Sequence, residues 1–442
     1  MPTDAALVSP QVVATNATRP ATTNSSSPSQ TAEVPYPIDE PYPAPIPTRP
    51  PQPTETPFLT PTPPPLPTPL PTPQVTVIPT AVPPIIPDAQ TADSFSILYR
   101  EDNLIKQLDG ESKEAEVILD TFATTSLYLA NRSHGIGWYE WGSLSPDSKK
   151  LALVLSTVPE LHLPSQDTPS FSIYIFDLDT RELTFLVEDA IEPVWSPDGT
   201  KIAYRRQIPE QDGGISSGLW LFDLVAATTH EIYSVEQNAG RYVTQYSWSP
   251  DSKAIVTLDI IAQSSVKLVV VPISNATPPT TIIPETTEDL FSPQWSPDGS
   301  QIAFVTTQSK QPTSQKIANI WVTTPDGSQI RQLTQNIFVT GGQPTWSSDG
   351  QWLAFAGAAL FESNEPTTEI WLVKADGSHI KRLTAESNNK LNVLMPIWSP
   401  NNSIIVFSKE QTELWVYQLA TGDQRQIGLA TLGFIIKAKE VK

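Results

Sequence analysis

Residues 294–304 read QWSPDGSQIAF, and this stretch decides the fold because close variants of it recur along the chain. The run Ser-Pro-Asp-Gly suits a tight turn, since proline presets φ at the second position and glycine is favoured at the fourth. The residues on either side favour strands. The stretch therefore predicts a hairpin that joins a strand ending at Trp295 to a strand beginning at Ile302.

Six versions of this motif occur, at intervals of 51, 53, 47, 51 and 52 residues. The first strand ends at Leu144 in the first version and at tryptophan in the other five: Trp195, Trp248, Trp295, Trp346 and Trp398. A second apolar run follows each motif, as in LWLFDL from Leu219, and Asp-Gly turns at 326–327 and 376–377 signal a later hairpin. Four antiparallel strands in about 50 residues are typical of one β-propeller blade, with the tryptophan packed between blades.

This repeat resembles that of the TolB-like β-propeller family, which carries WSPDG followed by IAF, then IWV and a DG turn. The resemblance covers residues 94–442 and implies an all-β propeller. It also implies a bacterial cell-envelope protein, located in the periplasm or at the cell surface. The family's small mixed α/β domain before the propeller has no counterpart here, where a Pro/Thr-rich segment takes its place.

The two ends of the repeat region set the number of blades. The segment FSILYREDNLIKQLDGESKEAEVIL from Phe95 aligns with the last three strands of a repeat and lacks a first strand. The β-like segment Gly433–Val441 can supply that strand. We therefore predict a ring of seven four-stranded blades over residues 94–442, closed between the chain ends, with six blades as the alternative.

Residues 1–93 differ in composition, because 26 of the 46 prolines precede residue 88. We predict a disordered linker or stalk, extended like polyproline, or else a disordered end without a task. No apolar run approaches the ~18 residues of a membrane-spanning helix. MPTDAALVSPQ lacks the features of a signal peptide, so a missing upstream signal or anchor remains an alternative.

Composition excludes several classes of function. The absence of cysteine rules out disulfide scaffolds and thiolate metal sites. The net charge is −20, of which the first 90 residues carry 2 − 6 = −4 and the remainder 25 − 41 = −16. Such a surface disfavours a nucleic-acid partner. We expect a monomer, without a cofactor.

Catalytic and metal patterns are weak. Gly214–Gly218 matches GxSxG, but that motif needs a following helix, whereas Gly218 leads into a predicted strand. The four histidines are scattered, which disfavours a metal site. The repeated aspartates, such as Asp198 and Asp298, are explained by hydrogen bonds within their turns.

Candidate ligand-binding residues lie on the rim opposite the SPDG turns, where the loops vary in length. An aromatic group falls outside the repeat pattern, in the connection that enters the first motif blade: Trp138, Tyr139 and Trp141. Four further residues are the basic and aromatic side chains of these loops: Arg205, Arg206, Arg241 and Tyr242. Arginine can bind a carboxylate or main-chain carbonyls. For both groups, packing or ordinary solvated charge is the alternative.

We therefore expect a non-enzymatic, extracytoplasmic binding propeller that recognises a peptide, a protein or a glycan through its loops. Two alternatives stay open. One is a glycan lyase or hydrolase that acts in the propeller funnel, and the other is a cytoplasmic interaction scaffold.

Overall fold

A computed structural model describes most of the chain from Phe95 to Ala438. The described residues are 95–101, 104–109, 115–120, 134–159, 170–206, 208–209, 215–235, 241–261, 265–274, 276–308, 317–335, 337–339, 343–359, 368–384, 393–410, 412–429 and 432–438. The predicted linker or stalk, residues 1–93, lies outside them. Every regular element within these ranges is a strand, so none of them offers a helix that could span a membrane.

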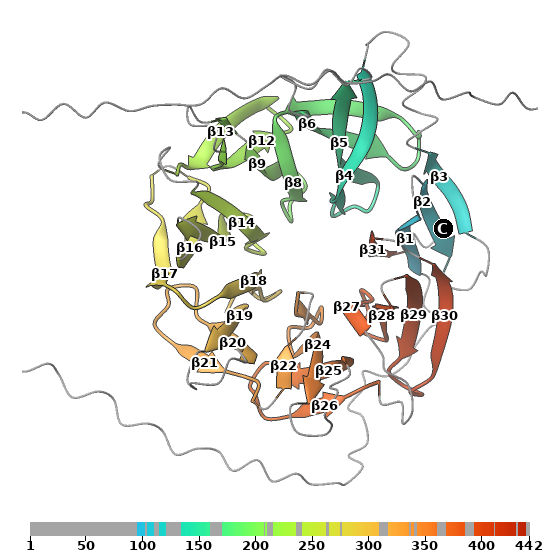
Figure 1. Cartoon of the computed structure of the whole chain (residues 1–442), viewed down its shortest axis with the longest axis vertical. Coiled ribbons are helices and arrows are strands. Elements are labelled where there is room, and N and C mark those ends of the chain that lie inside the picture. The colour runs from blue at the N-terminus through green and yellow to red at the C-terminus, as the bar shows by residue number, and fades with distance from the viewer. Residues whose placement is uncertain are drawn as a thin grey trace, which may run out of the picture. The chain divides into compact units, whose positions relative to one another are not determined.

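Seven sheets of antiparallel strands surround a common axis and form a β-propeller (Figure 1), which confirms the predicted fold and excludes the six-blade alternative. Blades 1 to 3 are listed from the axis outward. Blade 1 consists of β4 (His134–Leu144), β5 (Lys150–Pro159), β6 (Ser170–Asp177) and β7 (Leu183–Glu188). Blade 2 consists of β8 (Ala190–Trp195), β9 (Lys201–Arg206), β12 (Leu219–Asp223) and β13 (Thr228–Tyr233), with a separate small hairpin of β10 (Ile208–Pro209) and β11 (Ile215–Ser216). Blade 3 consists of β14 (Tyr242–Trp248), β15 (Ala254–Ile261), β16 (Ser265–Pro272) and β17 (Thr280–Thr286).

The remaining blades follow the same order. Blade 4 consists of β18 (Leu290–Trp295), β19 (Ile302–Gln308), β20 (Ile317–Thr323) and β21 (Ile330–Gln332). In blade 5 the first strand is split into β22 (Ile337–Val339) and β23 (Thr345–Trp346), followed by β24 (Trp352–Ala359), β25 (Glu369–Lys374) and β26 (Ile380–Arg382). Blade 6 consists of β27 (Val393–Trp398), β28 (Ile404–Lys409), β29 (Glu413–Gln418) and β30 (Gln424–Leu429). Blade 7 consists of β31 (Leu432–Ala438), β1 (Phe95–Glu101), β2 (Leu104–Asp109) and β3 (Ala115–Asp120).

The middle strands of each blade carry the core. β15 is apolar along nearly its whole length, and its central residues 255–259 are buried. Both faces of a middle strand pack on neighbouring blades, so it cannot alternate apolar and polar residues as a half-exposed strand does. The outer strand β7, with one face open, is only partly buried.

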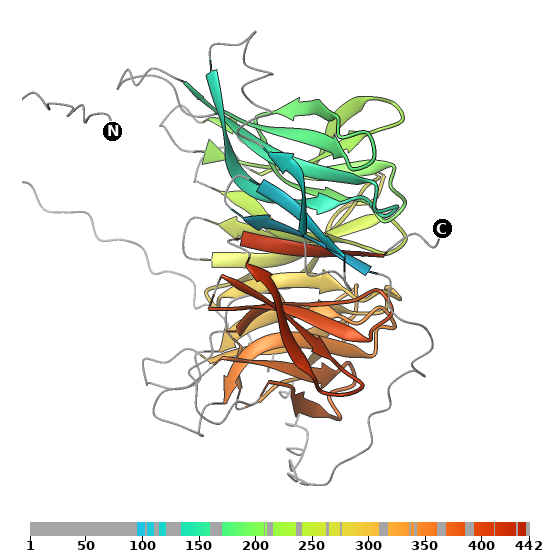
Figure 2. The same cartoon turned by 90° about the vertical axis from the view of Figure 1, so that its right-hand side faces the viewer.

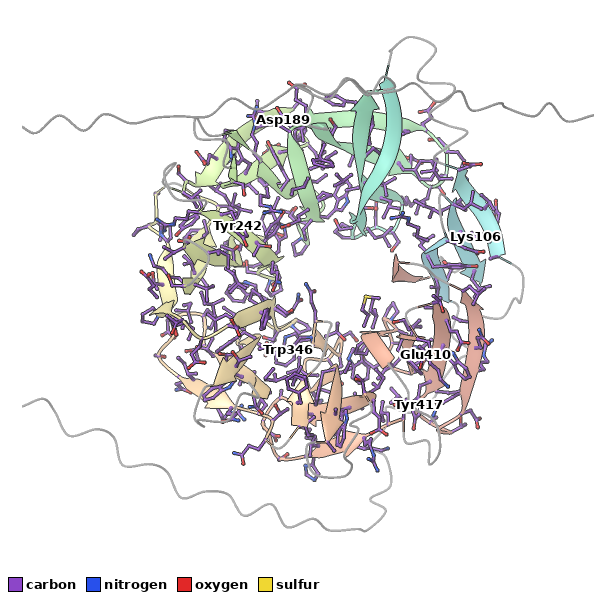
Figure 3. The ribbon with its side chains drawn as sticks, viewed as in Figure 1. Lys106, Asp189, Tyr242, Trp346, Glu410 and Tyr417 are labelled. Carbon is purple, nitrogen blue, oxygen red and sulfur yellow. The ribbon has the colours of Figure 1, made fainter. Side chains whose placement is uncertain are left out.

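Tryptophans at the ends of the first strands link successive blades, as the repeat predicts. The indole Nε1 of Trp248 donates to the carbonyl oxygen of Val194 at 3.1 Å, and that of Trp346 donates to the carbonyl oxygen of Gln294 at 3.2 Å. In each pair the acceptor immediately precedes the tryptophan of the previous blade. Figure 3 shows Trp346 nearer the axis than Tyr417, on the inner side of its blade.

The SPDG turns share one hydrogen-bond pattern. The Ser296 hydroxyl donates to Asp298 Oδ1 at 2.6 Å, and the same carboxylate oxygen accepts the Ser300 N–H at 3.0 Å. The other five turns repeat the serine bond, with asparagine as the acceptor in the last: Ser145–Asp147, Ser196–Asp198, Ser249–Asp251, Ser347–Asp349 and Ser399–Asn401. These bonds lower the pKa of Asp298. The aspartates therefore act as turn formers.

The ring closes where the sequence predicts it. β31 pairs antiparallel with β1, from Phe95 opposite Ala438 to Arg100 opposite Leu432. The chain thus supplies the innermost strand of blade 7 from its C-terminal part and the other three strands from residues 95–120. Figure 2 shows the red β31 beside the blue β1.

Removing residues 432–442 should destabilise the propeller by more than about 3 kcal/mol, because it exposes the edge of β1 and removes the contacts of β31 with β27 and β4. The measurement is urea unfolding followed by tryptophan fluorescence. Removing only residues 439–442 keeps β31 and should leave the midpoint unchanged. Equal midpoints for the two deletions would show that closure adds no stability.

Replacing Asp298 with Ala should lower the free energy of unfolding by about 1 kcal/mol at neutral pH, because the turn loses its acceptor. The folded-state pKa of Asp298 is lowered, so its carboxylate contributes stability above the unfolded pKa of about 4, and this contribution is lost as pH falls through the folded pKa. The difference between the variant and the parent in urea unfolding should therefore shrink from about pH 7 to about pH 2.5. Asp298→Asn is the matched control, since Asn401 makes the same turn bond in blade 6. A difference that does not change with pH would contradict this role.

Candidate functional site

The loop rim is the end of the ring opposite the SPDG turns, where the second strand of a blade ends and the first strand of the next begins. β9 ends at Arg206 and β14 begins at Tyr242, so Arg205, Arg206, Arg241 and Tyr242 all lie at this rim. Figure 3 labels Tyr242, on the inner part of blade 3. The four residues do not share one surface, however.

Arg205 lies between blades 2 and 3 and is largely enclosed. Its Nη2 donates to Glu192 Oε1 at 2.7 Å, and its Cζ lies 5.6 Å from the centre of the Tyr242 ring. Glu192 occupies a bulge in β8, with φ of 56°, and its carbonyl oxygen accepts the Tyr246 hydroxyl of blade 3. The bulge therefore fixes the carboxylate that orients Arg205.

Arg206 points to the opposite face of β9, because successive side chains of a strand alternate. Its Cζ lies 5.0 Å from the centre of the Trp220 ring. Trp220 packs with Tyr204 against apolar residues of blade 1. Arg206 thus belongs to the interface of blades 1 and 2 and is separated from the other three residues.

Arg241 forms a buried ion pair. Its Nε and Nη2 donate to the two carboxylate oxygens of Asp259 at 2.9 and 2.6 Å, and the Tyr233 hydroxyl donates to Asp259 Oδ2 at 2.7 Å. Asp259 is fully buried and Arg241 keeps 17% of its side chain exposed. Burial, followed by the neighbouring Asp259, raises the pKa of Tyr233, which keeps its phenol protonated and able to donate. The Nε and Nη2 atoms of Arg241 are therefore used in a structural ion pair.

We call Glu192, Arg205, Tyr233, Arg241 and Asp259 the polar seam. Among them, only Arg205 and Arg241 were predicted from the sequence. Asp259 had one signal, a single carboxylate in the apolar run AIVTLDII. Glu192 had none, because the corresponding bulge positions in other blades hold Gln245, Ser292 and Met395.

The aromatic group Trp138, Tyr139 and Trp141 lies within β4, not in a connection before it as predicted. β4 has 11 residues and two register shifts, between Trp138 and Glu140 and between Glu140 and Ser143. These bulges break the repeat pattern without ending the strand. The side chains of the three aromatic residues lie outside the described part of the structure.

The described residues do not assemble a hydrolytic triad. Ser216 of the GxSxG match lies in β11, and the chain continues into β12 with no helix. Ser378 Oγ lies 2.8 Å from His379 Nδ1, but both residues are exposed in a turn, and Asp376 accepts the Ser378 N–H instead of orienting the imidazole. Within the described ranges, no group of three or more acidic or histidine residues could hold a metal ion.

Asp259→Asn should destabilise the propeller by about 3 kcal/mol, because it leaves the buried Arg241 charge unpaired. Tyr233→Phe should cost about 1 kcal/mol, since it removes one hydrogen bond. The double variant Arg241→Met, Asp259→Leu should be more stable than Asp259→Asn, because no unpaired charge remains. Urea unfolding measures all three. A double variant as unstable as the single one would contradict this account.

Two curated proteins whose sequences are similar to this chain are named as peptidases. The chain is 28% identical over 115 residues to an uncharacterized peptidase, YuxL, of Bacillus subtilis, covering 26% of this chain and 16% of the relative. It is 26% identical over 211 residues to dipeptidyl-peptidase 5 of Porphyromonas gingivalis, covering 46% of this chain and 28% of the relative. The chain thus spans less than a third of the length of either protein. A prolyl endopeptidase structure superposes with a TM-score of 0.53, at 11% identity, over 79% of this chain and 51% of that one, which is a likeness of fold alone.

These relatives correct the expectation of a non-enzymatic binding propeller, because both curated proteins are named as peptidases. The expectation rested on the absence of a catalytic motif in the repeats, and a blade repeat reports the scaffold, not the chemistry that accompanies it. The resemblance to the TolB-like family is confirmed. Residues 274–433, which include blades 4, 5 and 6, match the TolB beta propeller domain family.

Proposed function

We propose that this chain takes part in peptide hydrolysis, as the propeller of a peptidase-type enzyme. The observation that carries the proposal is its sequence similarity to two curated peptidases, one of them matched over 211 residues. The enzymatic alternative raised from the sequence, a glycan lyase or hydrolase, agrees better with these names than a non-enzymatic binding propeller does, although the names point to peptides and not to glycans. The described ranges hold no hydrolytic triad and no metal cluster, so no catalytic group is assigned among them.

In this proposal the propeller binds peptide at the loop rim. Arg205 and Tyr242 form the part of the rim that the structure describes in detail, and Trp138, Tyr139 and Trp141 contribute from β4 of blade 1. Arginine and aromatic side chains dominate binding hot spots, and a guanidinium is suited to peptide carbonyl and carboxylate oxygens. Arg241 supports this site through Asp259, while Arg206 serves the interface with blade 1. We place the protein outside the cytoplasm, in keeping with the resemblance to the TolB-like family.

The test is peptide cleavage by the full chain, with a mixture of unstructured peptides as substrate and mass spectrometry of the products. We expect cleavage at a restricted set of sites. Inhibitors that react with an active serine and a metal chelator then separate the two main classes of peptidase. Peptides that remain intact at high protein concentration would overturn the proposal.

The loop-rim assignment has its own test. The paired substitution Trp138→Ala, Trp141→Ala and the single substitution Tyr242→Ala should raise KM about tenfold or more, since each removes aromatic contact area from the bound peptide. Asp298→Ala, on the opposite rim, is the matched control and should leave KM unchanged. An unchanged KM in the loop-rim variants would show that peptide does not bind at these residues.

A further inference from the structure

The outer strands of the seven blades separate by charge into two continuous arcs. In blades 7, 1, 2 and 3 the outer strands contain acidic residues and no lysine or arginine: Glu116, Asp120, Glu188, Glu231 and Glu285. In blades 4, 5 and 6 they contain cations and no acidic residue: Arg331, Lys381, Arg382 and Arg425. Figure 1 shows β21, β26 and β30 following one another along the circumference. We call these three strands the cationic arc.

The cationic arc is unusual in a chain with a net charge of −20. All four of its cations, Arg331, Lys381, Arg382 and Arg425, are exposed residues. Each strand also exposes one large apolar side chain: Ile330 is 44% accessible, Ile380 40% and Leu429 52%. Apolar side chains flanked by charge of one sign are typical of binding surfaces.

Two of the guanidinium groups are held in position. Arg331 Nη2 donates to the carbonyl oxygen of Ala375 at 2.8 Å, which joins blade 4 to blade 5. Arg382 lies over the Trp371 ring, with its Cζ 5.7 Å from the ring centre, and its Nη1 lies 3.4 Å from Glu369 Oε2. Groups fixed in advance lose less conformational entropy when a ligand binds.

The backbone of these strands is also open on one side. β21, β26 and β30 are each the last strand of their sheet, so no strand among the described residues pairs with their outer edge. Such an edge can accept an extended peptide as a further strand. Lysine and arginine along an edge disfavour pairing with apolar or cationic strands and thereby limit aggregation. They select for a partner of the opposite charge.

We propose that the cationic arc binds an acidic polypeptide segment in an extended conformation. A short peptide lies within a Debye length of about 8–10 Å of the arc and responds to its local positive charge. A long polyanion, or a second copy of this chain, extends over the acidic arc as well and is repelled by the net charge of −20. The arc lies on the circumference, away from the loop rim, so this proposal does not depend on the peptidase proposal.

The experiment measures binding of a fluorescent peptide of alternating Glu and Val by anisotropy, at low salt and at about 150 mM salt. We expect binding that weakens with salt and for which the matching Lys-Val peptide does not compete. The triple variant Arg331→Gln, Lys381→Gln, Arg425→Gln should weaken it about tenfold or more. Arg382 is left in place because it pairs with the largely buried Glu369.

The matched control is Lys149→Gln, Arg181→Gln, Lys253→Gln, which changes the net charge equally but at exposed cations of blades 1 and 3. It should weaken binding by no more than about twofold. An equal loss of peptide affinity in the two triple variants would show that binding depends on net charge alone, and would overturn the proposal. Retained binding in the arc variant would overturn it as well. So would self-association of the parent chain in sedimentation that the arc variant abolishes, or binding to anionic lipid vesicles without binding to the peptide, because either outcome names a different partner.

Discussion

The pairing of β31 with β1 is the contact on which the rest of the ring depends. A four-stranded blade cannot bury its own faces, so each blade is stable only between two neighbours. Without β31, blade 7 would offer its neighbours three strands, and β1 would keep an open edge next to the axis. The pairing register runs along nearly the whole of both strands, so the closing blade is as complete as the internal ones. Closure thus turns a chain of weak units into one folded ring.

The interfaces between blades differ in their polar contacts. Most blade interfaces consist of buried apolar residues such as Ala303, Leu353 and Phe355. The interface of blades 2 and 3 adds the polar seam, with Asp259 paired to Arg241 and Tyr233. A buried ion pair contributes little net stability, but breaking it is costly, so it restricts the alternative packings of the two blades. The seam therefore holds Arg205 and Tyr242 in a fixed relation at the loop rim.

The sequence predicted the scaffold because the scaffold is repeated. Serine recurs at all six turns, and proline and aspartate at five of them each. Each occurrence supports the same interpretation, so the strand pairs, the seven blades and the closing strand could all be inferred. The polar seam occurs once. Four of its members come from four different strands, and Arg241 lies just before β14. The contact of Arg205 depends on a β8 bulge that places Glu192 at φ of 56°. The corresponding bulge positions in other blades hold different residue types, so no recurring residue type marks these positions in the sequence. Trp138 and Trp141 were assigned to a connection for a related reason. Two register shifts in β4 interrupt the repeat pattern, so the sequence does not read as a strand there.

The same distinction explains why function was harder to infer than fold. A residue that repeats from blade to blade has a role that most blades need, which is structural, as the serine–aspartate turns show. Residues that serve a ligand are needed at one place, so they appear as departures from the repeat. Departures also arise from local packing, and Arg206 over Trp220 is such a case. Distinguishing the two requires knowing which partner each side chain already has. Arg241 is committed through its paired nitrogens to Asp259, whereas Arg205 uses only Nη2 on Glu192 and lies beside Tyr242. Of the two predicted arginines on this seam, Arg205 thus makes fewer hydrogen bonds within the described residues, and it is the one to which the proposed function assigns recognition.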